Sequence, residues 1–169
     1  MATKWQSTES FFVPQAIDET STTQQNPEGL IISARDVGIT DYGTGQFIYL
    51  PGAASTILSD WVTYDQKTLA TTLVASLTTK GKFAVAMSAN AATTSWGWYQ
   101  IQGQAVQTTT LTGNLDNNAL FPTATAGAVD NSGTATYVII GALTNGDVSL
   151  TPFKIDVILD HPMVLGQAI

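Results

Sequence analysis

Apolar and polar positions alternate in short runs from Leu30 onward, and this pattern predicts β-strands. In the run Phe153–Asp160, apolar side chains stand at Ile155, Val157 and Leu159, with polar positions among the residues between them. Because side chains of a strand point alternately to its two sides, these three share one face. The run Phe83–Ser88 has the same spacing, with alanines as the intervening residues. Those alanines are expected to form a smooth outer face that another surface can approach closely.

The turn residues Gly, Pro, Asn and Asp bound nine such runs, which is typical of an all-β sandwich or barrel. Asn145-Gly146 is a strong hairpin signal before the last run. No helix of ordinary length is indicated. We therefore predict an all-β fold, either a single β-barrel or a jelly-roll-like sandwich. The predicted runs are Leu30–Val37, Gln46–Leu50, Trp61–Asp65, Thr71–Ala75, Phe83–Ser88, Trp98–Gln102, Ala105–Leu111, Tyr137–Leu143 and Phe153–Asp160.

The first 29 residues differ from the rest and predict an extended N-terminal arm, followed by a knob domain over residues 30–169. The stretch Thr20–Pro27 is polar and has no apolar period. The arm nevertheless carries large apolar side chains, and each is worth roughly 1.5 to 3 kcal/mol when fully buried. We expect the arm to pack either on its own knob or on a neighbouring molecule. The large apolar residues of the arm are Trp5, Phe11, Phe12, Val13 and Ile17.

Charge and composition exclude several classes of protein. The chain of 169 residues has a net charge of -7, and only six of its residues are Lys or Arg. It cannot neutralise a row of phosphates, so nucleic-acid binding is not expected. The absence of cysteine excludes disulfides, thiolate zinc sites and cysteine nucleophiles. No apolar window suits a membrane span, and the first residues lack the features of an export signal, so synthesis in a cytoplasm is expected.

The search for catalytic and metal-binding motifs finds no strong signal. His161 is the only histidine and follows Asp160, which supplies two members of a hydrolytic triad but no nucleophile elbow. A surface histidine that closes the last strand is the simpler interpretation. Asp116-Asn117-Asn118 offers oxygen ligands without the spacing of a calcium loop. We therefore expect no enzymatic activity, no cofactor and no metal.

The aromatic cluster Trp96–Tyr99 is the most concentrated feature of the sequence. In a strand, Tyr99 and Ile101 share one face, while Trp98 lies on the other with Gln100. One tryptophan is therefore expected to point away from the core and to need a partner. That partner could be a sugar ring, the arm or another subunit.

Two segments around this cluster resemble the small capsid cement, or head decoration, proteins of tailed bacteriophages. They are Gly81–Ser88 and the G-W-Y-Q-I-Q-G strand at Gly97–Gly103. A looser likeness extends over Gly45–Asp160 and includes Phe47–Gly52 and Trp61–Asp65. The resemblance implies β-barrel or jelly-roll knobs without enzymatic activity, which sit as trimers on the outside of the head and bridge major capsid proteins.

From this resemblance we expect a homotrimer on the outer surface of a virion, with the major capsid protein as its partner. We expect the five large apolar residues of the arm to bind that capsid protein. A carbohydrate- or receptor-binding module of a virion, with an exposed Trp and Tyr platform, is the alternative. A hydrolase around His161 is a remote one. The residues expected on an oligomer or ligand face are Phe83, Val85, Met87, Trp96, Trp98 and Tyr99.

Overall fold

The fold is all-β, as the sequence predicts. The computed structural model describes residues 5–9, 13–38, 42–109, 117–131, 137–145 and 154–165, and none of these residues is helical. It follows that no helix in the described part of the chain could cross a membrane. The strands are β1 (Trp5–Ser7), β2 (Thr20–Ser21), β3 (Ile31–Asp36), β4 (Thr44–Pro51), β5 (Trp61–Tyr64), β6 (Thr71–Leu73), β7 (Gly81–Ala86), β8 (Trp96–Thr109), β9 (Ala119–Pro122), β10 (Val129–Asp130), β11 (Ile139–Thr144) and β12 (Lys154–Val164).

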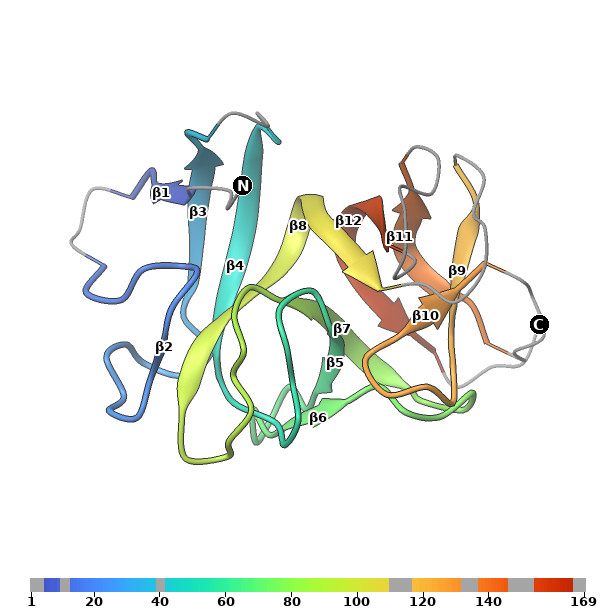
Figure 1. Ribbon diagram of the computed structural model, residues 1–169, viewed down its shortest axis with the longest axis horizontal. Helices are drawn as coiled ribbons and strands as arrows, with labels where there is room; N and C mark the ends of the chain where they lie inside the picture. The colour runs from blue at the N-terminus through green and yellow to red at the C-terminus, as the bar shows by residue number, and fades with distance from the viewer. Residues whose placement is uncertain are drawn as a thin grey trace.

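The strands form one antiparallel sheet with the order β1-β3-β4-β8-β7-β12-β11-β9-β10, while β2 pairs with β8, and β5 joins β6 to β7. Figure 1 shows β3 and β4 at one end of the molecule and β9, β10 and β11 at the other, with β8 and β12 between them. The sheet is open along this path. The barrel alternative is therefore wrong, and the arrangement is consistent with the sandwich alternative.

The long strand β8 replaces two of the predicted runs, Trp98–Gln102 and Ala105–Leu111. Its first half pairs with β4 and its second half with β12. Gly103 lies between the two halves with a φ of 93°. A Cβ there would stand 2.6 Å from the carbonyl oxygen of Thr44, so only glycine allows this bend and the close approach of β4. The strand continues through the glycine instead of ending at it.

The core occupies both sides of the central strands. Phe83 and Val85 of β7 pack in one cluster with Trp61, whereas Ala84 belongs to a second cluster on the opposite side with Tyr99. All of these side chains are buried. The expectation that the alanines of β7 form an outer face is therefore wrong. Alanines that alternate with larger apolar residues predict an exposed face, but here both faces of the strand are covered.

Candidate interaction surface

The N-terminal segment packs on its own sheet, which decides between the two placements left open for the arm. Strand β1 pairs with β3, and β2 pairs with β8. The rings of Trp5 and Phe47 meet edge to face with centroids 4.8 Å apart, and Val13 packs on the same cluster, in which Ile17 is buried. Phe11 and Phe12 lie outside the described residues. Of the five proposed capsid anchors, the three that are described thus have an intramolecular role in this chain.

Trp98 receives its partner from this segment. The side chain is fully buried, at 0% exposure, and its Nε1 donates a hydrogen bond to the carbonyl oxygen of Gln15 at 3.1 Å. The expectation that Trp98 is exposed is therefore wrong. Among a sugar, the arm and another subunit, the arm is what covers the indole ring.

Gln15 is the polar centre of this contact, and no sequence motif predicts it. Its Nε2 donates to the carbonyl oxygens of Glu19 at 2.8 Å and Trp96 at 3.0 Å. Its Oε1 accepts a hydrogen bond from the Tyr49 hydroxyl at 2.6 Å. The residue is only 4% exposed. A glutamine in a polar segment gives no sequence signal for such a role, because nothing local marks which polar side chain will be buried.

The residues predicted for an oligomer or ligand face lie mainly inside the chain's own core. Five of them are at most 2% exposed, so a partner cannot contact them on this fold, and the predicted face is corrected accordingly. Trp96 is partly buried, and its Nε1 donates to Glu28 Oε1 at 2.7 Å. Burial raises the pKa of Tyr99 well above its usual value, which keeps this hydroxyl protonated. The five buried residues are Phe83, Val85, Met87, Trp98 and Tyr99.

Three of the nine exposed large apolar side chains in the described part of the chain lie together on the outer face of β11 and β12, beside Ala119 of β9. Leu143 pairs with Ile158 across β11 and β12, and also with Ala119 of β9. Directly paired residues point to the same side of a sheet, so the three form a row. Leu143 is 43% exposed and Ile158 is 45% exposed. We call Ala119, Ile140, Leu143 and Ile158 the apolar strip.

An irregularity at Gly141 brings Ile140 into this strip. In a regular strand, residues three apart point to opposite faces. Here the register with β12 shifts between Ile140 and Ala142, and Gly141 adopts a φ of 79°. Ile140 is consequently 49% exposed and pairs with Met163 of β12. The bulge therefore extends the strip along β11, a typical use of bulges to re-aim side chains.

A polar network borders the strip beside Ile158. The Tyr42 hydroxyl donates to Asp156 Oδ1 at 3.1 Å, and Gln104 Nε2 donates to the other carboxylate oxygen at 3.2 Å. Burial and the nearby Asp156 carboxylate raise the pKa of Tyr42 well above its usual value. Tyr42 therefore remains a hydrogen-bond donor. These hydrogen bonds hold the polar side chains in place along this border of the strip.

A hollow of about 540 Å³ adjoins the other end of the strip, at the ends of β5, β7 and β12. Met163 links the two features, because it pairs with Ile140 of the strip and also lines the hollow. Lys67, Lys80 and Lys82 line it as well. Burial raises the pKa of Tyr64, another lining residue, so its hydroxyl stays protonated at neutral pH.

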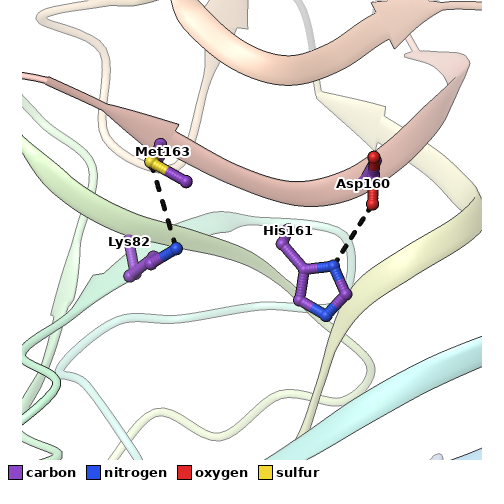
Figure 2. Close-up of polar contacts among 4 residues, drawn as sticks. All are labelled: Lys82, Asp160, His161 and Met163. Carbon is purple, nitrogen blue, oxygen red and sulfur yellow. Dashed lines mark hydrogen bonds and ion pairs between the residues drawn. The ribbon is translucent and has the colours of Figure 1, made fainter.

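His161 lies on the surface, as the simpler interpretation of the sequence predicts. Its Nδ1 is 3.3 Å from Asp160 Oδ1, and both side chains are exposed. Figure 2 shows the imidazole directed toward this neighbouring carboxylate, while Met163, farther along β12, contacts Lys82 of β7. The pair lies beside the bulge opposite Gly141 and not in the hollow.

Comparison with known proteins identifies no relative of the chain. No protein family, no curated protein and no solved structure matches the chain. A functional assignment therefore depends on the residues described above.

Proposed function

We propose that the protein is a non-enzymatic decoration protein of a phage head, which binds the outer surface of the shell as a homotrimer and holds major capsid proteins together. The resemblance of Gly81–Ser88 and Gly97–Gly103 to cement proteins supports the family. The observation that carries the proposal is the apolar strip, an outward face of paired strands that leaves large aliphatic side chains in water.

The strip suits adhesion for a physical reason. Each of its large side chains still exposes nearly half of its surface, and full burial of such a side chain is worth roughly 1.5 to 3 kcal/mol. Covering the rest would stabilise a contact by about 1 kcal/mol per side chain. Three subunits held together repeat that gain, since each contact already made raises the effective concentration for the next.

The strip takes the place of the arm in this proposal. The described arm residues already pack on the sheet, so the surface offered to the shell is the face of β9, β11 and β12. The alternative function, a carbohydrate platform, gains no support from this fold, because Trp98 and Tyr99 have no exposed face.

The test is co-sedimentation of the full chain with undecorated heads of the phage that encodes it. We expect the unaltered chain to bind and Ile158→Gln to bind about fivefold more weakly per contact, from a loss of about 1 kcal/mol. Ile31→Gln is the matched control, because Ile31 is 48% exposed on the distant strand β3. The proposal is overturned if the chain does not bind heads. It is also overturned if the chain is a monomer both in solution and at its binding sites on the head.

A further inference from the structure

We infer that the basic hollow is a binding site for the carboxylates of an acidic segment of a partner protein, with an apolar residue of that segment beside them. The inference rests on the proposed function only in taking that partner to be the shell protein. The site itself is argued from three observations, namely its charge, its walls and the strand edge beside it.

The charge of the hollow is opposite to that of the whole chain. The chain carries a net charge of -7 and has six Lys and Arg residues, yet three of the lysines line this one hollow. They come from the turn after β5, from the residue before β7 and from β7 itself. In the described part of the chain, no carboxylate forms an ion pair with Lys67, Lys80 or Lys82. Such a concentration of cations favours an anionic ligand.

The carboxylate of Asp65, which also lines the hollow, is engaged with its own turn. Its Oδ1 accepts hydrogen bonds from the backbone N–H groups of Lys67 at 2.9 Å and Thr68 at 2.7 Å, and from the Thr68 hydroxyl at 3.0 Å. These bonds shape the loop that carries Lys67. The three ammonium groups therefore outnumber the one carboxylate that lines the hollow, and backbone N–H groups already hydrogen-bond to that carboxylate.

Of the three lysines, Lys82 gives the strongest argument for an anionic ligand. Its side chain is half-buried, and the contact described for its ammonium is with Met163 Sδ, at 4.0 Å. Figure 2 shows the ammonium directed at this sulfur. A thioether is a weak acceptor, so a partly desolvated cation here gains little from it. A ligand carboxylate would form the charge-assisted hydrogen bond that the methionine cannot provide.

The walls and the strand edge favour a polypeptide over other anions. Val164 and Leu165, at the end of β12, give the hollow an apolar side. Strand β6 pairs with β5 alone among the described strands, and its residue Thr72 lines the hollow. An edge strand offers unpaired N–H and C=O groups, to which an extended peptide can hydrogen-bond. Neither phosphate nor an acidic sugar can extend the sheet in this way.

The first experiment titrates the full chain with a hexapeptide of alternating leucine and glutamate, followed by calorimetry. We expect binding that weakens as salt is raised, that falls about tenfold in Lys82→Gln, and that is unchanged in Arg35→Gln. Arg35→Gln is the matched control because this substitution removes the same charge from an exposed position on β3. Lys80→Gln is a second variant at an exposed position, in case Lys82→Gln perturbs folding.

Three ligand controls and one head-binding assay complete the test. The leucine–glutamine hexapeptide is expected not to bind. Binding of inorganic phosphate or of an oligogalacturonate, with none of the acidic peptide, would overturn the assignment to a polypeptide. If the unaltered chain binds heads and Lys82→Gln binds them as well as Arg35→Gln does, the hollow is not the shell contact, while the decoration function stands. If nothing binds heads but the acidic peptide binds the hollow, the decoration function fails alone.

Discussion

The contact made by Gln15 allows a quantitative prediction for the N-terminal segment. Replacing Gln15 with alanine removes three hydrogen bonds and leaves the Tyr49 hydroxyl without an acceptor in a buried place. An unsatisfied buried donor costs about 1 to 3 kcal/mol, and each carbonyl that loses a donor costs about 0.5 to 1 kcal/mol after water replaces it. We therefore expect Gln15→Ala to lower the free energy of unfolding by about 2 to 5 kcal/mol.

Urea unfolding followed by tryptophan fluorescence measures this loss, because Trp98 lies directly under the segment. Gln25→Ala is the matched control: the Gln25 side chain is exposed, while its backbone N–H still donates to the Tyr49 hydroxyl. Detachment of the segment alone would appear as an early fluorescence change with a small m-value, before the sheet unfolds. If Gln15→Ala and Gln25→Ala unfold within about 0.5 kcal/mol of each other, the reasoning is refuted.

Two further predictions concern the bulge and the turn that border the interaction surface. Gly141→Ala should lower the free energy of unfolding by at least about 2 kcal/mol, because alanine is strained at a φ of 79° and its Cβ would collide with the Asp160 carbonyl oxygen. Thermal unfolding measures this loss, and an unchanged melting temperature would contradict the prediction. Hydrogen bonds from Thr68 and Lys67 hold the pKa of Asp65 below its ordinary value near 3.8, so the stability they add is present above that value and is lost as pH falls through the lower folded-state pKa. The urea midpoint of Asp65→Asn, compared with that of the unaltered chain at about pH 6 and about pH 3, should therefore depend less on pH, and parallel pH profiles would argue against this turn.

The sequence predicts the strands that carry a strong local signal. The runs around Trp61, Phe83 and Val157 are confirmed. All three lie between turn residues, and the runs around Phe83 and Val157 also alternate apolar positions. The antiparallel pairing of β11 with β12, expected from Asn145-Gly146, is also confirmed, although the turn itself extends outside the described residues. In these places, local patterning and tertiary packing favour the same structure.

The errors arise where tertiary contacts decide the outcome. Gly103 marks the end of a strand in the sequence, yet a close approach to β4 makes it a bend within one. The two-residue strands β2 and β10 have no period to detect. The sequence predicts exposed side chains at Trp98 and Ala84, because no local pattern reports that distant segments cover them. The sequence does not predict the apolar strip either, since Ile140 and Leu143 share a face only because of the bulge between them.

The sheet order bears on how the chain folds. Strand β12, the last described strand along the chain, lies between β7 and β11, far from either end of the sheet. Its pairing with β8 joins segments about fifty residues apart, and contacts between distant segments slow folding. Until β12 arrives, β11 and the second half of β8 lack the partner that β12 provides, and such unpaired edges invite pairing with other chains. During synthesis on the ribosome, the sheet therefore remains divided at its centre until residues 154–164 have emerged, and this interval is when aggregation is most to be expected.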